Sequence, residues 1–322
     1  MALDLELIQP DIDRLNNTIR HDLSSNIPLI NTIADYIILS GGKRLRPLIT
    51  LICGNLLEVD NKPLLAEMAA MIEYIHTATL LHDDVVDESG LRRGRKTANA
   101  VFGNAASVLV GDFIYTRAFQ MMVRSNSIRL LQIMSEITNV ISEGEVLQLL
   151  NIGDANMTKE AYYKVIESKT AKLFEAGAKV ASILANASMD VENSITEYTV
   201  KLGIAFQIAD DVLDYVGDVS EMGKNIGDDL AEGKVTLPVI YALNLVDATK
   251  KAQLIEAINN PQEADIAKII AIIQASGGVE LAMQAAHEVS SEAIDALARF
   301  DDNNPYKQLL VELAHYSVSR LK

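Results

Sequence analysis

Several residue types are scarce in this sequence. It has no tryptophan and a single cysteine, Cys53, among 322 residues. One cysteine excludes an intrachain disulfide, so we expect a reducing compartment. Basic residues are outnumbered, with 28 Lys and Arg against 44 Asp and Glu and a formal net charge of −16. This charge disfavours broad contact with nucleic acid or anionic lipid, so a polyanionic ligand would need a local basic site or metal ions.

Long apolar runs are missing as well. The most apolar stretches that we identify, residues 237–246 and 269–275, fall short of the ~20 residues that a membrane-spanning helix needs. The first ten residues carry acids where a signal peptide has a basic region. We therefore expect a cytoplasmic protein without a membrane span.

Apolar residues recur at helical spacing almost throughout, and only 7 prolines and 17 glycines interrupt the pattern. Breaks near residues 40–42, 60–63, 87–97, 125–127, 153–158, 186–193, 216–234, 259–261 and 301–305 divide the chain into about ten or more helices. No linker rich in proline or serine and no tandem repeat is present. The sequence predicts a single all-α domain, a helical bundle over residues 1–322.

One acidic pattern occurs twice, each time after an apolar helical run: Asp83, Asp84 and Asp87, and then Asp210, Asp211 and Asp214. Positions i and i+4 lie ~40° apart around a helix and i+1 lies ~100° away, so each triplet should project over one helix sector. Clustered carboxylates repel one another and are costly to desolvate. One triplet could be a solvated acidic helix end, but two favour binding of a hard divalent cation such as Mg²⁺.

Basic residues gather beside these acids. The segment GGKRLRP at residues 41–47 opens a helix, and Arg92 and Arg93 follow the first triplet. Helix-start amides with Lys and Arg side chains form phosphate sites, although such a turn taken alone is more often a solvated basic loop. Residues 223–238, rich in glycine and charge, are typical of a mobile lid.

Together these patterns predict a helical bundle with two carboxylate triplets, bound Mg²⁺ and a cationic rim for two phosphorylated substrates. An apolar interior could hold a long hydrocarbon beside a diphosphate. These features combine in a prenyl-transfer enzyme.

The sequence resembles the trans-isoprenyl diphosphate synthases along nearly its whole length. The resemblance rests on the ordered motifs GGKRLRP at 41–47, LLHDDVVD at 80–87, RRG at 92–94, GD at 111–112, KT at 169–170, FQIADDVLD at 206–214 and the lid at 223–238. It is closest to the long-chain bacterial members. It implies the isoprenoid synthase fold, with helices around a central cavity, and a homodimer.

The resemblance also implies which side chains bind ligands. About three Mg²⁺ would be held by Asp83, Asp84, Asp87, Asp210, Asp211 and Asp214. Isopentenyl diphosphate would be held by Lys43, Arg46, His76 and Arg93. The allylic diphosphate would be held by Arg92, Lys169, Thr170, Gln207 and Lys224, with Lys234 closing the lid. Taken alone, His76 would be a hydrogen-bonded core histidine.

The implied reaction joins isopentenyl diphosphate to an allylic diphosphate such as farnesyl diphosphate. Departure of pyrophosphate leaves an allylic cation, which the double bond of isopentenyl diphosphate attacks. The expected product is all-trans octaprenyl diphosphate, passed to a membrane prenyltransferase for the side chain of a quinone such as ubiquinone. The alternatives are a geranylgeranyl, heptaprenyl or nonaprenyl product, or a non-catalytic partner subunit of a heteromeric synthase.

Side chains upstream of the first triplet are expected to set product length. Ala78 and Thr79 are small where short-chain members often carry aromatic rings, so the tunnel should continue past them. Eight extended isoprene units measure roughly 40 Å, so the tail must cross other helices. We hypothesise Met122 and Met134 as the tunnel floor, although Met at helical spacing is more often core filler. The direction of the bulky Tyr74 stays open.

Overall fold

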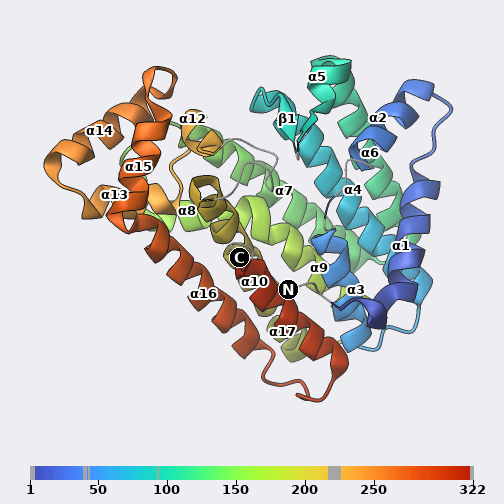
Figure 1. Ribbon diagram of the computed structural model, residues 1–322. Helices are drawn as coiled ribbons and strands as arrows, with labels where there is room; N and C mark the ends of the chain where they lie inside the picture. Colours follow the sequence, from blue (N-terminus) through green and yellow to red (C-terminus); the bar gives the residue numbers. More distant parts are fainter. Residues whose placement is uncertain (1–3, 39–41, 43, 93, 217–225, 320–322) are drawn as a thin grey trace. The chain divides into compact units, whose positions relative to one another are not determined.

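The computed structural model describes residues 4–38, 42, 44–92, 94–216 and 226–319. Helices make up nearly all the regular structure in these residues (Figure 1). The exception within the described residues is an antiparallel pair of two-residue strands, β1 (Leu91–Arg92) and β2 (Arg95–Lys96). The prediction of an all-α fold with about ten or more helices is confirmed, and the small hairpin lies inside the break expected at residues 87–97.

The chain divides into two compact units. The first unit comprises Met1–Ile137, Leu173–Thr196 and Arg299–Leu310, and the second comprises Thr138–Lys172, Glu197–Ala298 and Val311–Lys322. The helices α7 (Ile128–Leu150), α10 (Met189–Val216) and α17 (Pro305–Val318) contribute residues to both. A single domain over residues 1–322 stays a prediction.

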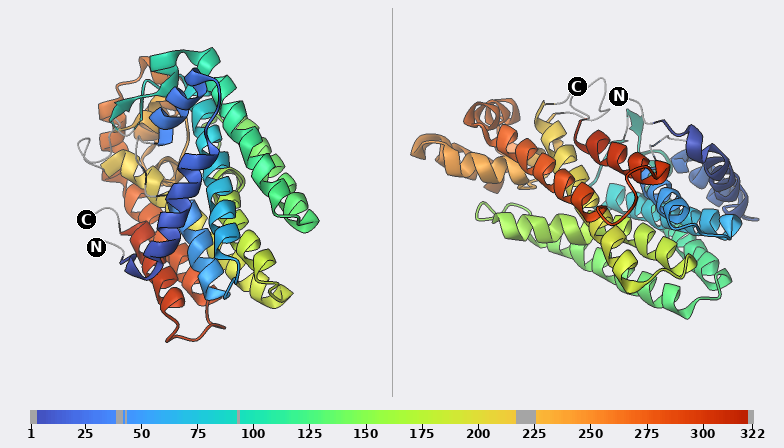
Figure 2. Two further views of the ribbon diagram at one scale, coloured as in Figure 1. Left: turned by 90° about the vertical axis from the view of Figure 1, so that its right-hand side faces the viewer. Right: turned by 90° about the horizontal axis from the view of Figure 1, so that it is seen from below.

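The first unit is built around α4 (Lys62–Val86), which packs against α1, α3 and α6. Figures 1 and 2 show α4 and α6 running side by side. The other elements of this unit are η1 (Glu6–Ile8), α1 (Gln9–Asp22), α2 (Pro28–Ile38), α3 (Leu45–Leu56), α5 (Ala98–Phe102), α6 (Asn104–Arg124) and α9 (Lys172–Leu184). The helix α4 is therefore held in place by three neighbouring helices.

The helix α3 is buried along almost its entire length, and Arg46 is the one residue of the helix that is not fully buried. Cys53 lies on this helix without solvent contact. Burial raises the pKa of the Cys53 thiol far above its ordinary value. Cys53 is therefore a core residue rather than a nucleophile, because the thiolate is the reactive form.

Among the described residues, α4 is the one helix that is by itself long and apolar enough to cross a membrane. Two-thirds of its most apolar window (67%) is buried inside the protein, which is typical of a core helix. The helices α15 and α16 pass the same test only as a pair, and they are bent by 62°. The apolar runs noted in the sequence lie in α13 and α15 instead.

Gly111 allows α6 to pack closely against α4 at His82. A Cβ atom on Gly111 would lie 2.3 Å from Nε2 of His82, so a larger residue would displace that imidazole. His82 Nε2 lies 3.2 Å from the carbonyl oxygen of Val108 and 3.4 Å from Oδ1 of Asp112. The GD motif at residues 111–112 thus faces the segment that carries the first aspartates.

The second unit gathers helices around the C-terminal half of α10. Its other elements are α8 (Lys159–Ile166), the π-helical turn η2 (Glu167–Ala171), α12 (Asp228–Ala231), α13 (Leu237–Leu245), α14 (Ala248–Asn259), η3 (Pro261–Glu263), α15 (Ile266–Ser276) and α16 (Gly278–Ala296). The helix α13 packs against α15 and α16, drawn in orange to red in Figure 1. Ile208 and Val212 of α10 belong to this apolar cluster, so the core anchors the helix that carries the second triplet.

Candidate active site

The first aspartate triplet lies at the end of α4, and its members differ in environment. Asp84 has no solvent-exposed surface, whereas Asp83 and Asp87 are half-buried. Nε and Nη2 of Arg92 contact the same oxygen of Asp84, Oδ1, at 2.8 and 2.7 Å. The other oxygen, Oδ2, is buried and has no hydrogen-bond partner among the described residues. The i+1 position therefore places Asp84 inward, and the triplet is not three equivalent carboxylates.

Arg92 reaches Asp84 because the β1–β2 hairpin turns back over the helix end. The backbone N–H of Thr97 donates to the carbonyl of Gly90 at 3.1 Å, and its hydroxyl donates to the carbonyl of Ser89 at 2.6 Å. The hydroxyl of Tyr36 donates to the carbonyl of Lys96 at 2.6 Å. The hairpin is thus held at both ends. Arg93 lies outside the described residues.

The two described arginines of the segment at residues 41–47 contact different partners. Arg44 has left-handed backbone (φ 45°) and donates through Nη1 to Oδ1 of Asn16 on α1. Arg46 lies 3.1 Å through Nη1 from Nε2 of His76. Because a guanidinium has only donors, Nε2 of His76 accepts this bond and carries no proton. The structure therefore brings Arg46 and His76 together, while Lys43 lies outside the described residues.

The guanidinium of Arg46 also stacks on an aromatic ring. Its Cζ lies 4.9 Å from the ring centroid of Phe174, a buried residue of α9. A cation over a ring face is attracted by the ring quadrupole, and this contact limits where the side chain can point. The sequence offered no signal for Phe174, since a buried aromatic residue in a helix is ordinary core.

The second triplet, at the end of α10, is arranged differently. Asp210 is exposed, whereas Asp211 and Asp214 are 5% and 8% exposed. Tyr162 donates through its hydroxyl to Oδ2 of Asp211 at 2.6 Å, and Gln207 donates through Nε2 to Oδ1 at 2.8 Å. Burial raises the pKa of Asp211 well above its usual range, and the nearby Asp229 adds to this, while the two hydrogen bonds act in the opposite direction.

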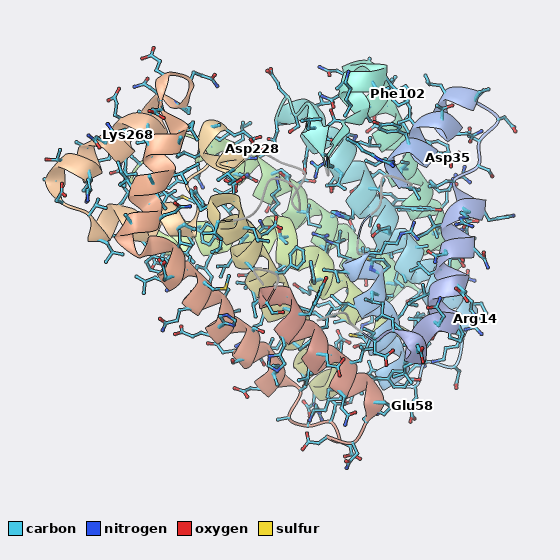
Figure 3. The ribbon with its side chains drawn as sticks, viewed as in Figure 1. Arg14, Asp35, Glu58, Phe102, Asp228 and Lys268 are labelled. Carbon is cyan, nitrogen blue, oxygen red and sulfur yellow. The ribbon has the colours of Figure 1, made fainter. Side chains whose placement is uncertain are left out.

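Asp214 organises the segment that follows. Its backbone carbonyl accepts from the N–H of Gly227 at 2.9 Å, and its Oδ2 accepts from the N–H of Asp229 at 3.2 Å. Asp228, labelled in Figure 3, begins the short helix α12 at this point. The described part of the expected lid is thus attached to the second triplet. Lys224 lies outside the described residues.

The π-helical turn η2 carries Lys169 and Thr170. The hydroxyl of Thr170 donates to Oε1 of Gln207 at 2.8 Å, and Nζ of Lys169 lies 2.6 Å from Oε2 of Glu145. A π-turn inserts an extra residue into a helix and is frequent at functional sites. The structure brings Thr170 and Gln207 together through a turn that helical periodicity does not reveal.

Lys234 lies in the loop after α12. Its Nζ is 2.5 Å from Oε2 of Glu232. The preceding residue, Gly233, accepts at its carbonyl from the N–H of Gly153 at 2.9 Å. The loop is therefore attached to the segment after α7, and Lys234 is held by the carboxylate of Glu232.

Three of the four residues predicted to control product length are core residues of the first unit. Ala78, Met122 and Met134 are buried, and the half-buried Thr79 donates to the carbonyl of His76 at 2.8 Å. The direction of Tyr74, open from the sequence, is now defined: its hydroxyl donates to the carbonyl of Ile19 on α1 at 2.9 Å. Tyr74 therefore points at α1.

The acidic residues suit a divalent cation shared with other oxygen ligands. No three His, Cys, Asp or Glu side chains within the described ranges converge to form a metal cage. Mg²⁺ usually takes one or two protein carboxylates and completes its shell with water and substrate phosphates. The buried Oδ2 of Asp84, which has no hydrogen-bond partner among the residues described, is an oxygen of the type that Mg²⁺ prefers.

Comparison with known proteins shows the family of this chain. The chain matches the family described as polyprenyl synthetase over residues 27–275. It is 47% identical to octaprenyl diphosphate synthase of Escherichia coli over 317 residues, covering 98% of this chain and 97% of that protein. It is 46% identical to octaprenyl diphosphate synthase of Haemophilus influenzae over 316 residues, covering 98% and 95%.

Solved structures show the same fold. The polyprenyl synthase of Caulobacter crescentus, complexed with calcium and isoprenyl diphosphate, has a TM-score of 0.95 at 39% identity and covers 99% of this chain and 97% of its own. The decaprenyl diphosphate synthase of Rhodobacter capsulatus has a TM-score of 0.92 at 41% identity and covers 99% and 98%. The fold is thus that of the isoprenyl diphosphate synthases.

The chain belongs to the polyprenyl synthetase family and is a prenyltransferase. The family assignment made from the motifs is confirmed. Members of this family generally depend on divalent metal ions, in agreement with the two aspartate triplets.

The buried ion pair of Asp84 generates a stability prediction. Replacing Arg92 by Leu should lower the free energy of unfolding by about 3 kcal/mol in EDTA, because the carboxylate of Asp84 stays buried without its cation. Urea denaturation followed by circular dichroism measures this change. Arg95→Leu is the matched control, since Arg95 is exposed on the facing strand, and it should stay within about 0.5 kcal/mol of the unchanged protein. Equal losses in both variants would contradict the prediction.

Proposed function

We propose that the chain is an octaprenyl diphosphate synthase that condenses isopentenyl diphosphate onto an allylic diphosphate such as farnesyl diphosphate. The observation that carries this proposal is the 46–47% identity to octaprenyl diphosphate synthases over nearly the whole chain. The buried aspartates at the ends of two apolar helices support it, because carboxylates are suited to bind the divalent cations that would accompany a diphosphate. Residues 1–322 would act as one catalytic domain.

The proposed metal ligands are the six aspartates of the two triplets, which would hold about three Mg²⁺. When bound, these ions would neutralise the charge that develops on the departing pyrophosphate. The protein keeps Asp84 and Asp211 in fixed positions through Arg92, Tyr162 and Gln207. Fixed ligands lose little reorganisation energy during the reaction.

We assign isopentenyl diphosphate to Lys43, Arg46, His76 and Arg93. The described pair supports this assignment, since Arg46 is held by both Phe174 and His76. A guanidinium is suited to phosphate because its N–H groups form paired hydrogen bonds. His76 accepts from Arg46 through Nε2 and could donate to a phosphate oxygen through Nδ1.

We assign the allylic diphosphate to Arg92, Lys169, Thr170, Gln207, Lys224 and Lys234. Lys169 and Lys234 are paired with Glu145 and Glu232, so binding would exchange a carboxylate for a phosphate on each ammonium. The dipoles of Thr170 and Gln207 would stabilise the allylic cation without capturing it. The released pyrophosphate would take the proton that is lost when the new double bond forms.

Product length would be set by the core of the first unit. Ala78 is buried and small, so it leaves room for a chain growing along α4. Tyr74 points at α1 and is therefore part of that helix contact. Met122 and Met134 remain the proposed floor, because both are fully buried and flexible.

We further propose a homodimer that uses an apolar face of α6. Leu109 and Val123 are 67% and 61% exposed, and Val108 and Phe119 are exposed on the same helix. Their spacing of 108, 109, 119 and 123 follows one side of a helix. An exposed apolar stripe of this kind marks an interaction surface more often than free surface.

The enzyme would act in the cytoplasm and pass its product to a membrane prenyltransferase of quinone synthesis. The acidic net charge of −16 disfavours permanent attachment to anionic lipid. An octaprenyl chain is too apolar to leave the protein into water, so a membrane-bound acceptor is required to remove it.

The reaction is tested by product analysis. With Mg²⁺, farnesyl diphosphate and labelled isopentenyl diphosphate, the purified protein should form mainly a C40 product. Asp83→Ala and Asp210→Ala should each lower the rate more than about 100-fold, because each removes a proposed metal ligand. A different dominant length would favour the geranylgeranyl, heptaprenyl or nonaprenyl alternatives. A folded protein that forms no product would favour the partner-subunit alternative.

The length assignment is tested separately by substitutions in the core. Ala78→Tyr should shorten the product sharply by closing the tunnel about one helical turn from the first triplet. Met122→Ala and Met134→Ala should lengthen it by one or more units. Chromatography of the dephosphorylated products measures the distribution, and Ala78→Ser is the size-matched control. An unchanged distribution in the Met variants would remove them from the tunnel floor.

The homodimer is tested by its mass in solution. Light scattering after size-exclusion chromatography should give twice the 35.1 kDa chain mass. Leu109→Glu should shift the protein towards monomer, because it places charge within an apolar contact. Ile27, 57% exposed before α2, provides the control, and Ile27→Glu should leave the mass unchanged. A monomeric starting protein would refute the proposed dimer.

A further inference from the structure

We propose that Tyr162 is a positioning residue that holds the carboxylate of Asp211 in the orientation needed to bind a divalent cation together with a diphosphate. This inference rests on the proposed function. Tyr162 lies on α8, 49 residues before Asp211 in the chain, and Asp211 lies on a different helix, α10. The contact therefore exists only in the folded second unit.

The geometry fixes both oxygens of the carboxylate. Oδ2 of Asp211 accepts from the hydroxyl of Tyr162 at 2.6 Å, and Oδ1 accepts from Nε2 of Gln207 at 2.8 Å. An ionised carboxylate has about four acceptor positions on its two oxygens. One donor on each oxygen fixes the plane of the group and leaves acceptor positions on both oxygens for a cation.

Tyr162 is itself immobilised. The residue is 3% exposed and belongs to the apolar cluster that includes Ile208 and Val212 of α10. Its ring meets the ring of Tyr163 edge-on, with centroids 5.8 Å apart and planes at 85°. The hydroxyl is thus delivered to Asp211 by a rigid ring, which a flexible side chain would not achieve.

Gln207, the second donor to Asp211, is itself held by a residue of η2. Gln207 accepts at Oε1 from the hydroxyl of Thr170, which lies on η2. A Cβ atom on Gly144 would lie 2.8 Å from Cβ of Ser168 and 2.9 Å from the backbone nitrogen of Lys169. Gly144 therefore allows the π-turn to lie directly against α7. Two structural routes, one through Tyr162 and one through Thr170, meet at the same carboxylate.

A tyrosine that only fills the core would be replaceable by phenylalanine. The variant Tyr162→Phe keeps the ring and removes one oxygen, so it separates packing from positioning. Tyr163→Phe is the matched control, because it removes the hydroxyl of the adjacent tyrosine. Asp211→Asn provides the background in which the contact of Tyr162 with an ionised carboxylate is absent.

The experiment measures Mn²⁺ binding by electron paramagnetic resonance in the presence of the unreactive analogue farnesyl thiodiphosphate, without turnover. Tyr162→Phe should weaken Mn²⁺ binding about tenfold, at the lower end of the effect of losing a hydrogen bond to a metal ligand. The Mg²⁺ concentration for half-maximal rate should rise by a similar factor, with KM for isopentenyl diphosphate unchanged. Tyr163→Phe should match the unchanged protein in both measurements.

A double-mutant cycle keeps the test independent of folding. In the Asp211→Asn background, Tyr162→Phe should cause no further loss of Mn²⁺ affinity, because its proposed action passes through Asp211. Equal losses in both backgrounds would overturn the proposal, as would unchanged Mn²⁺ affinity in Tyr162→Phe alone. The binding readout also separates the two proposals. A protein that binds Mn²⁺ with the analogue but condenses no isopentenyl diphosphate would refute the proposed reaction. The Mn²⁺ affinities of the Tyr162 variants would still decide the positioning role of Tyr162.

Discussion

The burial of two carboxylates at the ends of apolar helices is the constraint on which the site depends. Removing an ionised carboxylate from water costs several kcal/mol unless donors or cations surround it. Asp84 and Asp211 have almost no solvent contact, so each requires a structure built to receive it. The hairpin that carries Arg92 meets this requirement for Asp84. The helix α8 and the π-turn η2 meet it for Asp211.

The groups that compensate the two buried carboxylates differ in charge. Arg92 neutralises Asp84, whereas the hydroxyl of Tyr162 and the amide of Gln207 bring no charge to Asp211. Asp229 lies close enough to Asp211 to raise its pKa further. Without a cation, burial and Asp229 favour the protonated form of Asp211, whereas a bound divalent cation would favour its carboxylate. The two buried aspartates are thus compensated differently, even though the aspartate spacing is the same in both triplets.

The sequence was sufficient to predict the helices, the two acidic helix ends and the family, because these follow from apolar periodicity and from ordered motifs. It could not show that Asp84 points inward while Asp83 is half-buried, since identical spacing serves both triplets. Tyr162, Phe174 and the π-turn were missed for a related reason. Each acts through a contact between segments far apart in the chain, and none alters the local pattern of apolar residues.

The burial of Cys53 has a practical consequence. The chain has no other cysteine, and this one lies inside α3 with a thiol whose ionisation is suppressed. Towards maleimide or methanethiosulfonate reagents the folded protein should therefore behave as though it contained no thiol. A dye or spin probe could be attached at any single cysteine introduced on an exposed helix face, with Cys53 left in place and the core unaltered.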